Sequence, residues 1–271
     1  MLEFIERVLG AFCNWECLHD AFCLLNAFAL QHIHNFIKAP RRLFHLFGKF
    51  HVNSTYAVYL AKQQKHNIKY LVSIISENPD SYMFHTANIG LASVQAKVMN
   101  IPVIIKETRG EKEKELLDLE AAIKEAAQKH SISGIVCGAI ASKYQRSRVD
   151  KIAKKLGLVS LTPLWHKDPE TLLRDMLRAG FRIIITAVSA EGFGQSWLGR
   201  IIDEQTIQDL LELNKKHGVH ISGEGGEYET LVLDCPLFAK SIKITESDVW
   251  WQGNSGRLMI KDVVLEDKTA D

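Results

Sequence analysis

Apolar segments of strand length alternate with helical segments from residue 43 to residue 164. Each apolar segment is long enough for one buried strand, and they cover residues 43–47, 69–75, 102–106, 133–140 and 159–164. The helical segments between them cover residues 54–64, 90–99, 111–129 and 142–156. Because strands separated by helices run parallel and are covered on both faces, this order predicts an α/β fold with a doubly wound, Rossmann-like parallel sheet. Ligands of such sheets bind beyond the carboxyl ends of the strands.

A second, smaller α/β unit follows. Helices are expected at residues 168–179 and 205–217, with a β-branched strand at residues 181–188 between them. The first helix begins with an N-cap aspartate and a proline, and the second ends at a glycine. The segment from residue 241 to residue 265 predicts an antiparallel strand pair. We therefore expect an atypical N-terminal extension at residues 1–41, a nucleotide-binding domain at residues 42–165 and a substrate-binding domain at residues 166–271.

The overall charge is close to neutral, at +1, with a pI of about 7.7. This balance gives no electrostatic basis for binding nucleic acid or an anionic membrane, so neither is an expected partner. The five cysteines include no CxxC pair and are too sparse for a disulfide scaffold. A reducing cytoplasm is therefore the expected location.

The first fifty residues differ in composition from the rest. They hold eight of the twelve phenylalanines and three of the five cysteines, but only four acidic residues. Acidic side chains stand where a secretory signal needs basic ones, and the apolar run at residues 21–30 is too short to span a bilayer. The spacing of Cys13, Cys17, His19 and Cys23 fits no common zinc pattern, so no metal site is predicted. An apolar helix face here would need a cover, from the body of the protein or from a second subunit in a homodimer.

Residues 223–229 read Gly-Glu-Gly-Gly-Glu-Tyr-Glu and lead into a short apolar run. We call this segment the glutamate loop. Glycine permits positive φ and a close approach to the backbone, so the free amides of such a turn suit an anion. The carboxylates of Glu224, Glu227 and Glu229 suit an amine, ammonia or a phosphate that carries a metal ion. The alternative is a glycine-rich hairpin whose glutamates are only solvated.

The segment from Gly223 to Pro236 resembles the signature near the C-terminal end of the diphthine–ammonia ligase family, a branch of the PP-loop ATP pyrophosphatases. Further segments resemble motifs of the same family in the same order, at residues 77–86, 138–148 and 196–200. The resemblance covers residues 53–238. It implies a five-stranded nucleotide domain of the adenine nucleotide alpha hydrolase-like kind.

The resemblance implies ATP-dependent amidation. ATP would bind with Mg²⁺, a substrate carboxylate would attack its α-phosphate, and ammonia would convert the acyl-adenylate to an amide with release of AMP. The substrate of the family is diphthine, the modified histidine on elongation factor 2, so the expected partners are that protein and ammonia. Such catalysis depends on positioning and charge stabilisation, and no protein nucleophile is expected.

The resemblance also implies roles for individual residues. Three are expected to be catalytic: Glu227, His85 and Ser142. Eight are expected to contact ATP: Asn53, Ser54, Gly138, Ser142, Tyr144, Gln145, Arg146 and Arg148. Ten are expected to contact the substrate: Glu77, Asn78, Ser81, Met83, Trp197, Glu224, Gly225, Gly226, Tyr228 and Glu229.

Some of these roles have structural alternatives. Arg146 and Arg148 lie near a helix start, where positive charge is unfavourable, so they bind either an anionic ligand or acidic groups of the protein. Tyr228 and Trp197 are candidates for holding a trimethylammonium group, whereas Trp197 also suits a packing role.

The phosphate loop departs from the family pattern. The family has Ser-Gly-Gly-Lys-Asp-Ser, whereas residues 49–54 read Lys-Phe-His-Val-Asn-Ser, so only the final serine is kept. Without the glycines the backbone cannot approach phosphate as closely. One hypothesis is that the segment before Asn53 is foreign to the fold, from a frame shift or a misassigned start. Another is a natural chain that has lost catalysis and binds ATP only. A different PP-loop enzyme, such as a tRNA-modifying one, would need a basic face or extra cysteines, and neither is evident.

Overall fold

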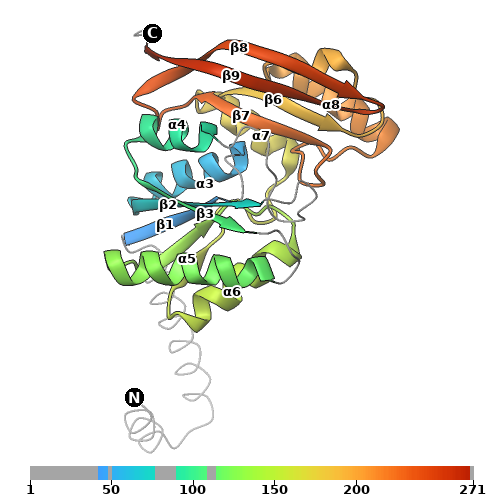
Figure 1. Ribbon diagram of the computed structural model, residues 1–271. Coiled ribbons are helices and arrows are strands. Elements are labelled where there is room, and N and C mark those ends of the chain that lie inside the picture. Colours follow the sequence, from blue (N-terminus) through green and yellow to red (C-terminus); the bar gives the residue numbers. More distant parts are fainter. Residues whose placement is uncertain (1–41, 48–50, 77–89, 109–113, 269–271) are drawn as a thin grey trace, which may run out of the picture. The chain divides into compact units, whose positions relative to one another are not determined.

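The computed structural model describes residues 42–47, 51–76, 90–108 and 114–268, and Figure 1 labels their helices and strands. These residues belong to one compact unit, which contains a five-stranded sheet and a four-stranded sheet. None of the helices in these ranges is long and apolar enough to pass through a bilayer. The domain boundaries expected at residues 41/42 and 165/166 stay predictions.

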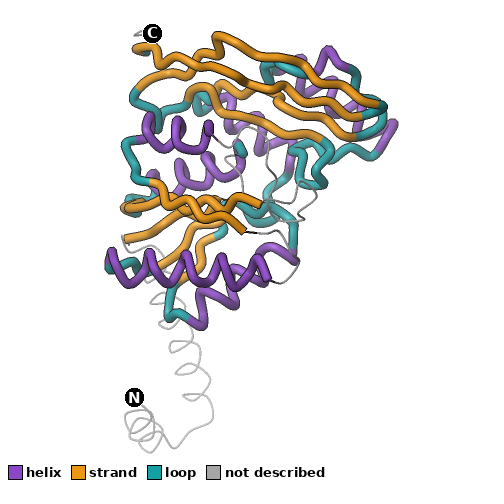
Figure 2. The backbone as a smooth tube through the Cα atoms, in the orientation of Figure 1, coloured by secondary structure: helices purple, strands orange, loops and turns teal. Residues whose placement is uncertain are grey.

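The first sheet is parallel throughout, with the strand order β3-β2-β1-β4-β5. Its strands are β1 (Arg42–Phe47), β2 (Asn67–Ser76), β3 (Val103–Thr108), β4 (Gly134–Cys137) and β5 (Val159–Leu161). The helices of this part are α3 (Val52–Gln63), α4 (Gly90–Met99), α5 (Lys114–His130) and α6 (Lys143–Lys155). Figure 2 shows helices on both faces of the sheet. The doubly wound α/β fold expected from the alternating segments is therefore confirmed.

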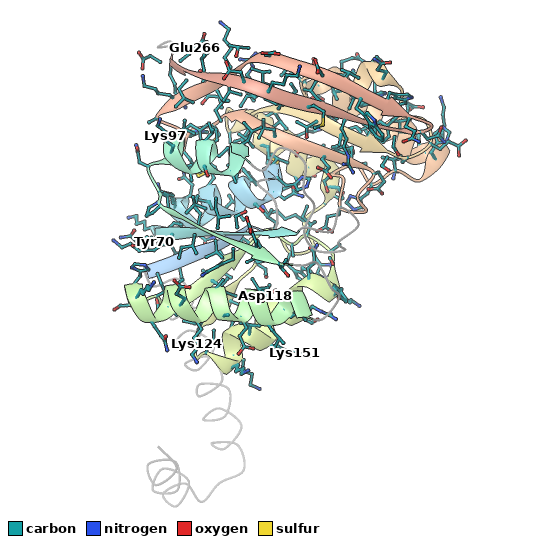
Figure 3. All side chains as sticks on the ribbon, viewed as in Figure 1. Tyr70, Lys97, Asp118, Lys124, Lys151 and Glu266 are labelled. Atoms are coloured by element: carbon teal, nitrogen blue, oxygen red, sulfur yellow. The ribbon has the colours of Figure 1, made fainter. Side chains whose placement is uncertain are left out.

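Helices α5 and α6 cover one face of this sheet through a narrow apolar stripe. Leu119, Ala122, Ile123 and Ala126 of α5 are fully buried at helical spacing, whereas Leu117 is 67% exposed. Thr108, at the end of β3, donates a hydrogen bond from Oγ1 to Asp118 Oδ2 (2.6 Å). The outer faces of the two helices carry exposed charged side chains, among them those of Lys124 and Lys151 (Figure 3).

The second sheet is antiparallel, with the order β7-β6-β9-β8. Its strands are β6 (Arg182–Ser189), β7 (Tyr228–Asp234), β8 (Lys240–Gln252) and β9 (Ser255–Asp267). The helices are α7 (Pro169–Arg178), α8 (Glu204–His217) and the short η1 (Gln195–Trp197). The expected N-cap aspartate accepts a hydrogen bond from the Thr171 amide, and the glycine after α8 has a φ of +70°. Both helix ends and the strand pair are confirmed.

Helices α3 and α4 lie between the two sheets (Figure 1) and join them into one core. The ring of Phe181, just before β6, packs edge-on against Tyr56 and Tyr59 of α3, with centroid distances of 5.3 and 5.6 Å. Gln95 of α4 is completely buried, and its Nε2 donates to the backbone oxygen of Val232 on β7 (3.0 Å). The parallel sheet and the antiparallel sheet are therefore fixed to each other by packing.

Two boundaries differ from the sequence expectation. Helix α3 begins at Val52 with His51 as its N-cap, rather than with Asn53 or Ser54 in that position. Strand β4 ends at Cys137, because the chain then leaves the sheet and turns towards α6.

Candidate active site

The connection between β4 and α6 passes close to the start of α3. We call residues 138–142 the β4–α6 loop. A Cβ on Gly138 would lie 2.9 Å from the Ser54 nitrogen and 3.0 Å from the Asn53 oxygen. These contacts are with backbone atoms, so only glycine fits there without a shift of α3. The structure thus brings together three of the residues expected to contact ATP.

Ser142 ends the β4–α6 loop as the N-cap of α6. Its Oγ accepts a hydrogen bond from the Gln145 amide (3.3 Å), which satisfies one of the free donors of the first helical turn. The expected catalytic role of Ser142 and the nucleotide contact of Gln145 stay predictions. Their geometry accounts for both residues as a helix cap.

The two arginines of α6 contact aromatic rings of the protein. The guanidinium of Arg146 lies 4.3 Å from the centroid of the Trp165 ring, and its Nε is 3.3 Å from Asp150 Oδ2. The guanidinium of Arg148 lies 3.2 Å from the centroid of the Tyr144 ring. These contacts match the alternative in which protein groups balance the arginines. Contact between these side chains and ATP stays a prediction.

Glu224 connects the glutamate loop to the β4–α6 loop. Its Oε1 accepts a hydrogen bond from the Ile140 amide (2.6 Å) and its Oε2 accepts one from the Ala141 amide (2.8 Å). The sequence predicted an anion at these amides, and here the anion is a side chain of the same protein. This contact brings two of the four motifs to one place.

Glu227 is held within the glutamate loop. Its Oε1 accepts a hydrogen bond from the His220 amide (3.0 Å), and its Oε2 is buried with no hydrogen-bond partner among the described residues. A Cβ on Gly225 would lie 2.7 Å from Glu227 Oε2, so the missing side chain leaves room for this carboxylate. Gly223 and Gly226 have φ values of +68° and +85°, which glycine adopts without strain.

The two aromatic candidates for a substrate cage lie in the core. Tyr228 is 2% exposed, and its hydroxyl donates to the backbone oxygen of Ile221. Burial raises the pKa of the Tyr228 hydroxyl far above its usual range. Trp197 is 8% exposed and packs edge-on against Phe193, with 5.0 Å between ring centroids. In this conformation neither ring faces a ligand, because core packing covers both, and for Trp197 this matches the packing alternative.

The remaining expected residues are placed as follows. Glu229 lies on β7 opposite Ala187 of β6, and Gly226 lies exposed in the glutamate loop. Five residues of the second motif lie outside the described residues: Glu77, Asn78, Ser81, Met83 and His85. Within the described ranges, no group of three or more His, Cys, Asp or Glu side chains could hold a metal ion.

Sequence reasoning missed three contributors to this region. Thr230 Oγ1 accepts a hydrogen bond from the Val52 amide at the start of α3 (3.4 Å). His166 donates from its amide to the backbone oxygen of Ile140 (2.8 Å), and Trp165 lies beside Arg146. Only Thr230 had a signal in the sequence, since it directly follows the glutamate loop.

Two side-chain oxygens at the start of α3 are buried without a hydrogen-bond partner in the described part of the chain. They are Asn53 Oδ1 and Thr55 Oγ1, and Thr55 is fully buried. Buried polar atoms normally have partners, so these two mark a place where a bound group would gain hydrogen bonds.

Comparison with known families gives two matches that together cover most of the described chain. A family model described as diphthamide synthase N-terminal domain matches residues 48–160, and one described as diphthamide synthase C-terminal domain matches residues 168–265.

Individual relatives agree. The diphthine–ammonia ligase of Bos taurus is 39% identical over 186 residues, which cover 64% of this chain and 69% of the relative. The diphthine–ammonia ligase of Homo sapiens is 38% identical over the same shares. That of Danio rerio is 34% identical over 72% of this chain and 82% of the relative. A solved structure of a predicted tRNA methyltransferase subunit from Methanocaldococcus jannaschii covers 72% of this chain and 98% of its own at 14% identity, with a TM-score of 0.39, which is too low to support an argument.

Proposed function

The chain belongs to the diphthamide synthase family, and on that premise we propose that it is an ATP-dependent ligase that converts diphthine on elongation factor 2 to diphthamide. In the proposed reaction the diphthine carboxylate attacks the α-phosphate of ATP and pyrophosphate leaves. Ammonia then attacks the acyl carbon of the adenylate, AMP leaves and one proton is lost from the nitrogen. Elongation factor 2 and ammonia are thus the proposed partners, and the cytoplasm is the proposed location.

The observation that carries this proposal is the contact of Glu224 with the Ile140 and Ala141 amides. It joins the glutamate loop of the second part of the chain to the β4–α6 loop at the carboxyl end of a parallel strand. Ligands of doubly wound sheets bind at this end of the strands. The two motifs therefore meet at the edge of the sheet where a nucleotide would bind.

The start of α3 fits a nucleotide in part. Gly138 allows the β4–α6 loop to lie against Asn53 and Ser54, and the buried oxygens of Asn53 and Thr55 are free to accept hydrogen bonds. We propose that these groups hold ATP. Mg²⁺ would be bound mainly by the phosphates of ATP, as usual for this ion.

Glu227 is the group best suited to the ammonia step. Its buried Oε2 has no partner in the described ranges and lies in a loop with exposed glycines on one side. We propose that this oxygen holds ammonia and takes the proton that leaves when the C–N bond forms.

The relic alternative is supported by a specific observation at the phosphate loop. The Val52 amide, one of the first donors of α3, donates to Thr230 of the second sheet. His51 and Val52 stand where the family has glycine and lysine, so the family's phosphate contacts are lost here. A chain of this kind would bind ATP weakly and would not release AMP.

The reactivity of the described cysteines bears on the tRNA-modifying alternative. Burial raises the pKa of the Cys137 thiol to about 11 and that of Cys235 to about 12. Both thiols are neutral near pH 7, whereas sulfur transfer needs a thiolate. Neither is suited to that chemistry.

One assay separates the ligase from the relic. The purified chain is incubated with ATP, ammonia and elongation factor 2 that carries diphthine, and AMP release is measured. AMP release that requires both other substrates supports the ligase. Binding of ATP in calorimetry without AMP release supports the relic, and a chain that neither binds ATP nor releases AMP contradicts both.

A further inference from the structure

The Glu224 carboxylate is fully used by the protein itself. Its two oxygens accept hydrogen bonds from consecutive amides that lie 84 and 83 residues away in the sequence. Hydrogen bonds to an ionised acceptor are shorter and stronger than those between neutral groups. Glu224 is therefore the firmest side-chain link between the glutamate loop and the β4–α6 loop among the described residues.

The β4–α6 loop depends on this link because its own amides have no strand or helix to bind. Strand β4 ends at Cys137 and α6 begins at Lys143, so the Ile140 and Ala141 amides fall between them. Ile140 is 1% exposed, and its amide would be buried and unpaired without Glu224.

The same loop is also held from two other directions. The backbone oxygen of Ile140 accepts a hydrogen bond from the His166 amide (2.8 Å). Gly138 lies against the start of α3, with no room for a Cβ. The position of Gly138 relative to Ser54 therefore depends on the shape that Glu224 and His166 impose on the loop.

We propose that Glu224 is a positioning residue for nucleotide binding, which acts by fixing the β4–α6 loop against the start of α3. The inference rests on the proposed function, because it assigns the nucleotide to that junction. It assigns Glu224 a role inside the protein instead of the substrate contact expected from the sequence.

A carboxylate bound to two amides also describes a plug that an anionic ligand must displace. The two roles predict opposite results. Removing a positioning residue weakens ATP binding, whereas removing a plug strengthens it.

The test uses Glu224→Gln and Glu224→Ala in the full chain, with Glu212→Gln as the matched control. Glu212 lies on the exposed surface of α8, paired with Lys215. Glutamine offers only one acceptor oxygen and turns its NH₂ group towards the second amide, so one hydrogen bond is lost. Alanine loses both. Because one hydrogen bond to a charged group is lost, we expect amide exchange in a peptide covering residues 138–142 to rise by about tenfold or more in Glu224→Gln.

ATP binding is measured by calorimetry on the same proteins, and AMP release is measured as kcat and KM. We expect the Kd and the KM for ATP to rise by about tenfold in Glu224→Gln with a smaller change in kcat, because a loop held in the wrong shape weakens ground-state binding. The control should match the wild-type chain in all readouts. A purely structural role would raise amide exchange and leave the affinity for ATP unchanged.

The outcomes separate this inference from the proposed function. Unchanged amide exchange, unchanged ATP affinity or tighter ATP binding in Glu224→Gln overturns the positioning role, even when the wild-type chain releases AMP. ATP binding without AMP release in the wild-type chain overturns the ligase reaction and leaves the ATP affinities of the variants to decide on Glu224. A wild-type chain that binds no ATP overturns both.

Discussion

The glutamate loop and the start of α3 lie near the same junction but differ in how well their residues fit their surroundings. In the glutamate loop, glycines and carboxylates are matched: Gly225 leaves room for Glu227, and Glu224 reaches two free amides. At the start of α3, two buried oxygens have no partner among the described residues, and the family's glycines are absent. The glutamate loop keeps the family arrangement, whereas the start of α3 holds only part of it.

This difference teaches where function is most at risk. A loop whose polar groups bind one another keeps its shape without a ligand. A helix start that lacks its phosphate contacts keeps its place by packing, because Val52 is buried and Gly138 lies against it. The fold can thus persist while nucleotide affinity is lost.

The largest effect is expected from Glu227→Gln. If Glu227 Oε2 takes the proton from ammonia, its loss should lower AMP-forming turnover by about 100-fold, since general base catalysis contributes at least that much. ATP affinity should stay unchanged, because the substituted group does not touch the β4–α6 loop in this structure. Turnover is measured with saturating ATP, with Glu212→Gln as the control. Normal turnover in Glu227→Gln would remove the glutamate loop from the chemistry.

Gly138→Ala should have the next largest effect, because it tests the contact between the two regions. The new Cβ would lie 2.9 Å from the Ser54 nitrogen, and backbone atoms can relieve such a clash only by moving α3. We expect a loss of about 2 kcal/mol in the free energy of unfolding, typical of overpacking. Urea unfolding measures it. Gly90→Ala is the control, because no atom lies within 4 Å of a Cβ there. Equal stability of the two variants would show that α3 is not held against Gly138.

Restoring Ser-Gly-Gly-Lys-Asp at residues 49–53 tests the start of α3 directly. The glycines and the lysine should return backbone and charge-assisted contacts to phosphate, so we expect ATP to bind about tenfold more tightly or better. The protein itself should become less stable, because Val52 is 2% exposed and its replacement by lysine removes a buried apolar side chain. Calorimetry and urea unfolding should therefore move in opposite directions. Unchanged ATP affinity would contradict our account of the phosphate loop.

Much of the fold was readable from the sequence because its signals are local. The alternation of apolar and helical segments predicted the parallel sheet, and the aspartate before α7 and the glycine after α8 marked helix ends by their own chemistry. The end of β4 was predicted three residues too late, since Ile140 is apolar and buried like a strand residue. Its amide bonds to Glu224 instead of a neighbouring strand, and no local pattern shows that.

The site was less readable, because its contacts join distant segments. Glu224 was assigned to a ligand, since the sequence does not show that two free amides lie 84 residues away. Tyr228 was assigned to the substrate because it lies within a motif, whereas packing against Phe193 places it in the core. Contacts of this kind follow from the relative placement of the two sheets.

Tyr228→Phe should have the smallest effect, and it asks whether the glutamate loop owes its shape to core contacts. The Tyr228 hydroxyl donates to the backbone oxygen of Ile221, just before the loop, and the ring is 2% exposed. Phenylalanine keeps the packing and removes this one hydrogen bond, so we expect a loss of about 1 kcal/mol in the free energy of unfolding. Urea unfolding measures it, with Tyr56→Phe as the control for loss of a hydroxyl on a buried ring. Because the ring faces no ligand here, AMP release and ATP affinity should stay at the wild-type level. A large rise in the KM for the elongation factor, with stability unchanged, would instead return Tyr228 to the substrate contact that the sequence predicted.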